Sequence, residues 1–300
     1  GLLALRYDFE VGELSPGREV RLVLEYPERC RAFVNGVRLK GRRDGTWLDP
    51  RWVCFGIGDL VQSGGNRITL EYDAFRYGDP KTVEPPEHRY GTEIEAVYLI
   101  GDFHVEGNCM APAPLQDLFE TWQVPSVGTQ MLGREGIRIA DPKPLDPGEI
   151  GRQGLPFYAG RIVLEAEIPP YESAGVLALE IDQLQAPVAD VAIDGQVVGH
   201  FVAQPWRVDL GDYLSEGRAH WLSITLYTTL RNLLGPHHNV EGEMIRVGPE
   251  HFRSGDMAAH AEPLTRLHGW ARGDGCPADW CEDYCLINVG DLGAIRLLRG

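Results

Sequence analysis

The chain has 300 residues and a formal net charge of −16, with 43% hydrophobic and 24% charged residues. These proportions are typical of a globular protein and exclude a collagen-like or disordered chain. No apolar run reaches the roughly 20 residues that a membrane-spanning helix needs, and a surface this acidic repels phosphate backbones. The composition therefore predicts neither a membrane nor a nucleic-acid partner. Residues 1–5 lack a basic region and a cleavage site, so they predict no signal peptide and indicate no compartment. The first and last residues of the sequence indicate that it was cut from a longer chain.

Alternating apolar and polar residues, the period of a half-buried β-strand, begin at once in residues 3–11. The same alternation returns in residues 21–26, 67–72, 161–168 and 222–228. Turn sequences such as Asn35-Gly36 and Asp194-Gly195 punctuate these runs, and no stretch keeps a helical period for long. Many short strands with turn signals predict an all-β fold of antiparallel sandwiches.

An internal duplication is the most informative feature of the sequence. An apolar strand, an Asn-Gly or Asp-Gly turn, a tryptophan, a Gly-Asp turn and a last strand occur once in residues 32–72 and again in residues 191–227. Because the offset of about 155 residues suits whole domains, we expect one sandwich in residues 1–150 and a second in residues 151–300. The Pro-rich residues 141–149 would join them. We expect three pairs of positions to be equivalent: Val34 with Ile193, Trp52 with Trp206, and Leu70 with Leu226.

The duplicated pattern resembles the galactose-binding-like jelly rolls that serve as sugar-binding domains in glycoside hydrolase family 2 and its relatives. Three further stretches narrow the resemblance: residues 98–103 (YLIGDF), 153–160 (QGLPFYAG) and 229–238 (TLRNLLGPHH). Together they look like the C-terminal region of large, multidomain bacterial glycosidases of the α-L-rhamnosidase type. The resemblance covers nearly the whole chain and implies two tandem jelly-roll sandwiches.

In such enzymes the carboxylates that cleave the glycosidic bond lie in a catalytic barrel, and the sandwiches around it are accessory. This sequence has no strand–helix alternation from which to build a (β/α)8 barrel. The resemblance therefore implies a non-catalytic region with two partners, a plant or bacterial glycan and a barrel domain elsewhere in a longer parent chain. It carries over no catalytic residue and no cofactor.

Aromatic and polar side chains of the second half are the candidate sugar contacts. In the strand around residue 224, Trp221 and Tyr227 share the face opposite the core, where they could meet a sugar ring or another domain. His237 and His238 follow in a loop, the kind of segment that carries binding residues. The predicted carbohydrate-binding residues are Trp206, Trp221, Tyr227, His237, His238 and Glu243.

Metal binding is the rival interpretation of the same loop, since imidazole and carboxylate groups of His237, His238, Glu241 and Glu243 both suit zinc. Adjacent histidines in an extended chain point apart, so we predict no metal site. The three cysteines 276, 281 and 285 lack the two tight Cys pairs of usual zinc sites. Two alternatives to sugar binding remain open: a complete glycan hydrolase, metal-assisted through residues 237–243, and a structural module that docks on a barrel through Trp221 and Tyr227.

Overall fold

A computed structural model describes residues 1–76, 92, 94–110, 129–170, 176–235, 237–238 and 282–299. In this part of the chain the helical elements are single turns: η1 (Pro27–Arg29), η2 (Gly151–Gln153) and α2 (Arg231–Leu234). The rest of the regular structure is β-strand, so the predicted all-β sandwich class is confirmed. No helix in the described residues is long and apolar enough to cross a membrane. The chain forms two compact units: unit 1 (residues 1–106 and 136–143) and unit 2 (residues 107–135 and 144–300).

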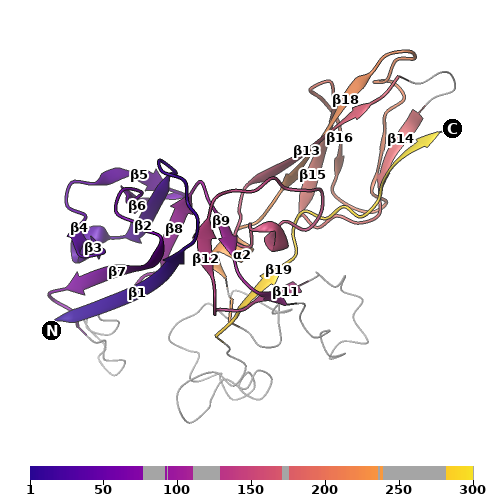
Figure 1. Cartoon of the computed structure of the whole chain (residues 1–300). Helices are drawn as coiled ribbons and strands as arrows, with labels where there is room; N and C mark the ends of the chain where they lie inside the picture. The colour runs from indigo at the N-terminus through magenta and orange to yellow at the C-terminus, as the bar shows by residue number, and fades with distance from the viewer. Residues whose placement is uncertain are drawn as a thin grey trace, which may run out of the picture. The chain divides into compact units, whose positions relative to one another are not determined.

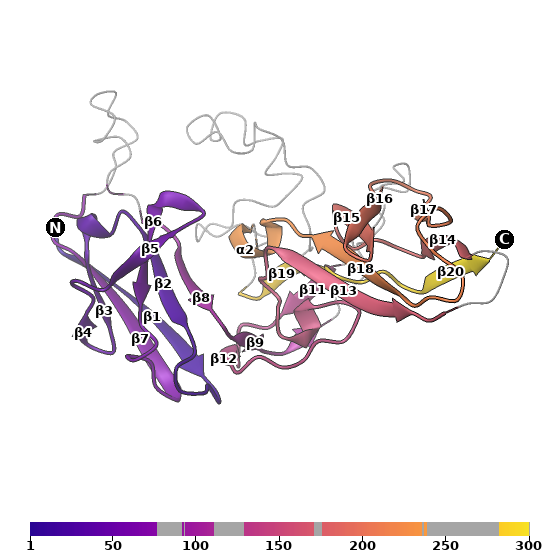
Figure 2. The ribbon, with the colours of Figure 1, turned by 90° about the horizontal axis from the view of Figure 1, so that it is seen from above.

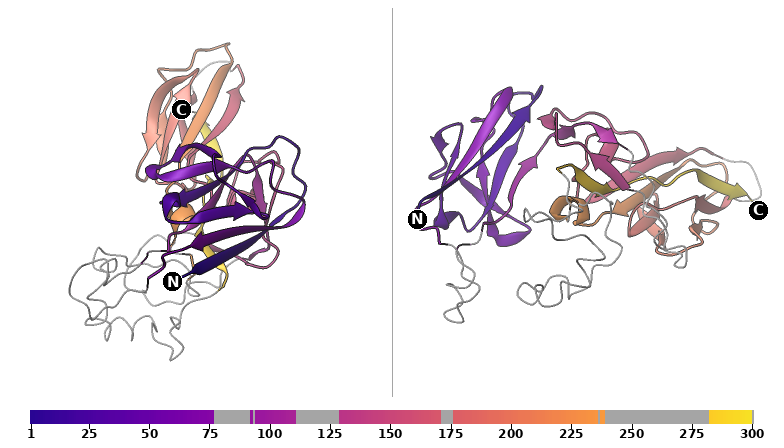
Figure 3. Two further views of the ribbon diagram at one scale, coloured as in Figure 1. Left: turned by 90° about the vertical axis from the view of Figure 1, so that its left-hand side faces the viewer. Right: turned by 90° about the horizontal axis from the view of Figure 1, so that it is seen from below.

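Unit 1 contains a six-stranded sheet in the order β4-β3-β7-β1-β12-β9 and a four-stranded sheet in the order β5-β6-β2-β8 (Figure 1). All neighbouring strands are antiparallel except β1 and β12, which are parallel. Figure 3 shows these strands, in indigo and purple, from two further sides. The strands are β1 (Leu3–Val11), β2 (Val20–Glu25), β3 (Arg31–Val34), β4 (Val37–Arg38), β5 (Arg43–Trp47), β6 (Asp49–Gly56), β7 (Gly64–Tyr72), β8 (Val97–Gly101), β9 (His104–Glu106) and β12 (Arg138–Ala140).

Unit 2 contains a four-stranded sheet in the order β13-β18-β15-β16 and a three-stranded sheet in the order β17-β14-β20. The last strand of the described chain, in yellow, runs beside β14 (Figures 1 and 2). A third small sheet has the order β10-β11-β19. The strands are β10 (Cys109–Met110), β11 (Thr129–Leu132), β13 (Arg161–Ile168), β14 (Val176–Ile181), β15 (Val188–Ile193), β16 (Gln196–Phe201), β17 (Arg207–Asp209), β18 (His220–Tyr227), β19 (Tyr284–Ile287) and β20 (Ile295–Arg299).

Each unit has its own apolar core between its sheets, built from the inward positions of alternating strands. In unit 1, Leu22, Val34 and Leu70 belong to this core and are at most 2% exposed. In unit 2, Leu179, Val191 and Ile224 take part in the same way and are at most 2% exposed. The alternation read from the sequence is the physical origin of both cores, because successive side chains of a strand point to opposite faces of its sheet.

The two units share a strand arrangement. The order β4-β3-β7-β1 in unit 1 matches β16-β15-β18-β13 in unit 2, and β6-β2-β8 matches β17-β14-β20. Val34 pairs with Ile68 directly before one turn, and Ile193 pairs with Leu222 directly before the other. The expected equivalence of Val34 and Ile193 therefore agrees with the register of the strands.

The register differs from two of the expected equivalences. Counted from these pairs, Leu70 corresponds to Ile224, and Leu226 lies two residues farther along β18. Trp206 corresponds to Val53 and not to Trp52, because the Gly-Asp turns begin at Gly58 and Gly211, 153 residues apart. The shift by one residue reverses the face: Trp206 packs against the core of unit 2, whereas Trp52 shares the outer face of its sheet with Trp47 and Tyr98.

Matching polar pairs fasten the hairpin turn of each unit. Asn35-Gly36 and Asp194-Gly195 both have positive φ at the two central positions, which suits the twist of a two-residue hairpin. The Asn35 amide donates to the Oδ1 atom of the buried Asn66 at 2.8 Å, and the Asp194 carboxylate lies 2.9 Å from Nδ1 of the buried His220. Asn66 and His220 therefore have equivalent roles in the two units.

Candidate functional site

A pocket of about 400 Å³ lies at one end of the unit 2 sandwich, where the chain leaves β14 and β18 and enters β15 and β17. Its apolar wall includes Leu184, Pro187, Trp206 and Ile287. Its polar groups are mostly amides and hydroxyls from Gln183, Gln185, Gln204, Thr228, Thr229 and Asn288. Small-molecule sites in proteins have this composition, an apolar wall with a few polar groups that fix orientation.

Short hydrogen bonds hold the loop between β14 and β15, which forms one wall of the pocket. The Gln183 amide donates to Oδ2 of Asp291 at 2.7 Å, and the backbone N–H of Gln185 donates to the carbonyl of Asp291 at 2.9 Å. In return the carbonyl of Gln185 accepts from Gly290 N–H at 2.9 Å. The wall is therefore fastened to the segment that follows β19, and the pocket is formed without a ligand.

Two amide oxygens in the pocket wall lack a hydrogen-bond donor. Gln185 Oε1 and Asn288 Oδ1 are buried and have no partner among the described residues. Buried acceptors are usually paired, because an unpaired one costs about 1–3 kcal/mol. The wall thus has unused hydrogen-bonding capacity beside Trp206.

Asp182 is the one carboxylate among the described residues that line the pocket. The hydrogen bond from Arg296 holds the pKa of Asp182 below its ordinary value. A glycosidase needs two carboxyl groups, one of them protonated, on either side of the scissile bond. The described residues of this pocket supply one carboxyl group and not such a pair.

Trp221 and Tyr227 lie on the outer face of β18, as the alternation predicts. The Trp221 ring is 46% exposed, and its N–H donates to Oε1 of Glu165 at 3.2 Å. The Tyr227 hydroxyl donates to Oδ2 of Asp190 at 2.7 Å, and Asp190 also contacts Nδ1 of His200 at 2.7 Å. Six strand positions, about 20 Å, separate Trp221 from Tyr227, so they cannot touch the same small sugar.

His237 and His238 lie in a cluster of rings beside β19. The ring of His237 is 5.9 Å from that of Phe157 and 5.7 Å from that of Tyr284, and its Nε2–H donates to the Asn232 carbonyl at 2.8 Å. His238 Nδ1 contacts the carbonyl of Asp283 at 3.1 Å. The cluster joins the two stretches singled out in the sequence, residues 153–160 and 229–238.

The structure thus separates the predicted sugar contacts. Trp206 lines the pocket, Trp221 and Tyr227 lie on the outer sheet face, and the two histidines lie in the ring cluster. Glu243, together with Glu241, Cys276 and Cys281, lies outside the described residues. Within the described ranges, no group of three or more His, Cys, Asp or Glu side chains is arranged to hold a metal ion.

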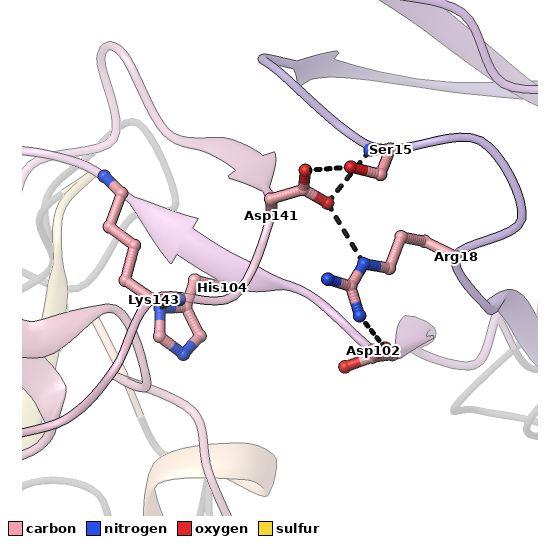
Figure 4. Close-up of polar contacts among 6 residues, drawn as sticks. All are labelled: Ser15, Arg18, Asp102, His104, Asp141 and Lys143. Carbon is pink, nitrogen blue, oxygen red and sulfur yellow. Dashed lines mark hydrogen bonds and ion pairs between the residues drawn. The ribbon is translucent and has the colours of Figure 1, made fainter.

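In unit 1, Asp141 fastens the loop between β1 and β2 (Figure 4). A hollow of about 650 Å³ lies beside this loop. The Asp141 carboxylate accepts from the backbone N–H of Ser15 at 2.9 Å and from Arg18 Nε at 3.1 Å, and Arg18 also pairs with Asp102. The hydrogen bonds from Ser15 and the guanidinium of Arg18 hold the pKa of Asp141 below its usual range. An ionised, fully engaged carboxylate is a structural anchor and not a proton donor.

Two histidines make the stability of the chain sensitive to pH. Burial lowers the pKa of His104, whose Nδ1 accepts from the Lys143 N–H at 3.1 Å (Figure 4), and burial also lowers the pKa of His237. The unfolded chain therefore binds more protons than the native chain just below the unfolded pKa of about 6.5. We expect the histidine contribution to the free energy of unfolding to be complete above about pH 7 and to fall as the pH is lowered through about 6.5.

Urea unfolding at several pH values, for the native chain and His104→Asn, tests this expectation. Asn offers an oxygen where Nδ1 accepts its hydrogen bond, but it does not titrate. The variant should lose less stability than the native chain between about pH 7.5 and pH 5.5. Equal losses of stability in the two proteins would show that His104 does not cause the pH dependence.

Comparison with known proteins gives no family assignment. No protein-family model matches the sequence, and no curated protein matches it. A similar solved structure is a rhamnosidase from Novosphingobium sp. PP1Y, with 14% identity, a TM-score of 0.25, and coverage of 77% of this chain and 18% of that one. An α-L-rhamnosidase from Streptomyces avermitilis has 13% identity and a TM-score of 0.27, with coverage of 75% of this chain and 22% of that one. A β-glycosidase from Bacteroides vulgatus has 13% identity and a TM-score of 0.24, with coverage of 76% of this chain and 21% of that one. The chain spans about a fifth of their length, and at these TM-scores the likeness carries no argument about its activity. The solved structures with which this chain shares a partial likeness are glycoside hydrolases.

Proposed function

We propose that the chain is a non-catalytic carbohydrate-binding region of a larger glycoside hydrolase. It is built from two tandem galactose-binding-like sandwiches, with the boundary between them near residue 150 of the sequence. The pocket at the end of unit 2 is its sugar site. The observation that supports this proposal is Trp206 beside a set of amide side chains with unused hydrogen-bonding capacity. An aromatic ring packs against the C–H face of a sugar, and amides and hydroxyls pair with its hydroxyl groups.

The expected affinity is weak. A stacked aromatic ring contributes about 0.5–1.5 kcal/mol beyond its buried area, and the pocket brings one such ring to the ligand, that of Trp206. A monosaccharide should therefore bind with a Kd of about 1 mM, near −4 kcal/mol. The titration below, and not the shape of the pocket, identifies the plant or bacterial glycan that supplies the sugar.

Titration of rhamnose, galactose and short plant-gum oligosaccharides, followed by NMR, tests the sugar site. In Trp206→Ala, the affinity should fall about tenfold, equal to 1.4 kcal/mol, because the stacking surface is lost. The matched control is Trp221→Ala, which removes an exposed tryptophan on the outer face of the same unit and should leave binding unchanged. Loss of binding in Trp221→Ala, His237→Ala or Tyr227→Phe would instead move the sugar site to that residue.

The same protein should release no aglycone from aryl glycosides. Turnover above the uncatalysed rate, lost in Glu241→Gln or Glu243→Gln, would contradict the non-catalytic role and favour a complete hydrolase. The expectation rests on the chemistry of glycoside cleavage, which needs two carboxyl groups.

Docking on a catalytic barrel is the second candidate function, and the outer face of β13 and β18 favours it. Val163 is 52% exposed and Trp221 is 46% exposed on this face. Exposed tryptophan is enriched at protein interfaces. If no glycan binds, and if adding the rest of the parent enzyme quenches the fluorescence of Trp221, the chain is a docking module.

A further inference from the structure

A second pocket, of about 300 Å³, lies in unit 1 between the start of β3 and the turn that joins β4 to β5. Its floor is the apolar edge of the core, where Ala32, Leu39 and Phe55 are each at most 9% exposed. Its rim carries Arg38, Lys40 and Arg43, all exposed. The pocket therefore combines an apolar base with a ring of positive charge.

Three of the four cations that line this pocket have no carboxylate partner among the described residues, whereas the fourth, Arg31, pairs with Glu71 and Asp73. Within the described part of the chain, Arg38, Lys40 and Arg43 make no ion pair, although the chain as a whole has a net charge of −16. Some arginines elsewhere in unit 1 are paired, as Arg42 is with Asp59 and Arg67 is with Asp8. Among the described residues, no carboxylate lines the pocket. In an acidic protein, three unpaired cations around one concave site make a local field that attracts anions.

The strand register places Arg43 on the pocket side of its sheet. Arg43 pairs with Phe55 across β5 and β6, so both lie on the face that looks toward the core. The backbone N–H of Leu39 donates to the Ala32 carbonyl at 2.9 Å, and Gly41 turns the chain with φ of 82°. The rim is thus held by the backbone of the sandwich.

We propose that this pocket binds the acidic group of a sugar, the carboxylate of a uronic acid or the sulfate of a sulfated sugar. That the ligand is a sugar rests on the proposed function; that it is an anion rests on the rim. Arginine binds carboxylate and sulfate through paired N–H groups, and the apolar floor accepts the C–H face of the ring. The volume of about 300 Å³ suits one or two sugar rings. A long polyanion such as a nucleic acid would also meet the acidic remainder of the chain.

Titration of galacturonate and of galactose 6-sulfate, with neutral galactose beside them, tests the proposal on the full chain. The two acidic sugars distinguish a carboxylate from a sulfate ligand. The acidic sugar that binds should do so with a Kd of about 1 mM and lose about tenfold in affinity in Arg38→Ala/Lys40→Ala/Arg43→Ala. About 0.5 M NaCl should weaken the binding as well, since exposed charges are screened.

A matched control variant, Arg6→Ala/Arg207→Ala/Arg299→Ala, removes the same charge from exposed arginines outside the pocket and should bind as the native chain does. Shifted amide resonances of residues 31–43 on addition of the acidic sugar would locate the ligand in the pocket. Unchanged affinity in the pocket variant, or equal binding of inorganic sulfate or of a short single-stranded DNA, would overturn the proposal. Trp206→Ala should not change the affinity for the acidic sugar. A negative result for this pocket can therefore be told apart from a negative result for the Trp206 pocket.

Discussion

Ile224→Ala should lower the free energy of unfolding of unit 2 by about 2–5 kcal/mol, the usual cost of truncating a buried aliphatic side chain. Ile224 is 2% exposed at the centre of β18, where it pairs with Leu164 on one side and Val191 on the other. Neither neighbouring strand can close the cavity without moving the backbone ladder. Guanidinium unfolding measures the loss, and hydrogen exchange of the β13 and β15 amides locates it.

The equivalent change in unit 1 is Leu70→Ala, since Leu70 is 2% exposed and holds the same register position in β7. It should cause a loss of similar size, about 2–5 kcal/mol, with faster exchange in β1 and β3. Val163→Ala, at a 52% exposed position of β13, is the matched control and should change stability by less than about 0.5 kcal/mol. A large loss in the control, or none in Ile224→Ala, would contradict the assignment of the core.

His220→Ala should cost about 1–3 kcal/mol because it leaves a backbone donor unpaired. The Nε2 atom of His220 accepts from Ser215 N–H at 2.9 Å, so the proton is on Nδ1, which donates to Asp194 at 2.9 Å. The side chain is 2% exposed, so water cannot replace these partners. Thermal unfolding of the native chain and the variant, under the same conditions, measures the effect.

His220→Asn should recover most of that loss, because unit 1 already uses this solution. There Asn66 accepts from the Gln62 N–H at 2.9 Å, as His220 does from Ser215, and it pairs with the turn residue Asn35. The matched control is Asp209→Ala, an exposed carboxylate of β17 that should have little effect. If the Asn variant were as unstable as the Ala variant, the two turns would not be equivalent.

Much of the fold could be predicted because period-2 alternation determines which face of a strand is buried. Residues 3–11, 67–72 and 222–228 read as half-buried strands and form β1, β7 and β18, with ends that differ by at most three residues. The parallel strand β12 could not be predicted in this way, because Arg138–Ala140 is too short to show a period. Its pairing with β1 on one side and with β9 on the other makes it a strand.

The expected equivalence of Trp52 and Trp206 shows that a correctly recognised motif can still pair two residues that do not correspond. Trp52 and Trp206 both precede a Gly-Asp turn, but one lies six residues and the other five residues before the glycine. In a strand, one residue reverses the face, so Trp206 meets the core and Trp52 the outer surface. Counting back from Gly58 and Gly211 would have revealed the difference in the sequence alone.

The candidate site was predictable only in part. Trp206 was among the predicted contacts, but the amides beside it, Gln183, Gln185 and Asn288, were not. The pattern Gln183-Leu-Gln185 directly after an alternating strand offered a signal for the first two, since loops at one end of a sandwich converge. Asn288 comes from a segment distant in sequence, and only the paired strands bring it to the pocket.

The pairing of β14 with β20 sets an order of events during synthesis. Unit 1 can complete its sheets once residues 138–140 have left the ribosome, because β12 is the last strand it needs. Unit 2 waits much longer: β14 has only β17 beside it until residues 295–299 emerge. Strands that pair over long separations form late and stay exposed to aggregation in the meantime. The nascent chain thus presents the unpaired edge of β14 during the translation of more than a third of its sequence, and chaperones should be found on unit 2 rather than on unit 1.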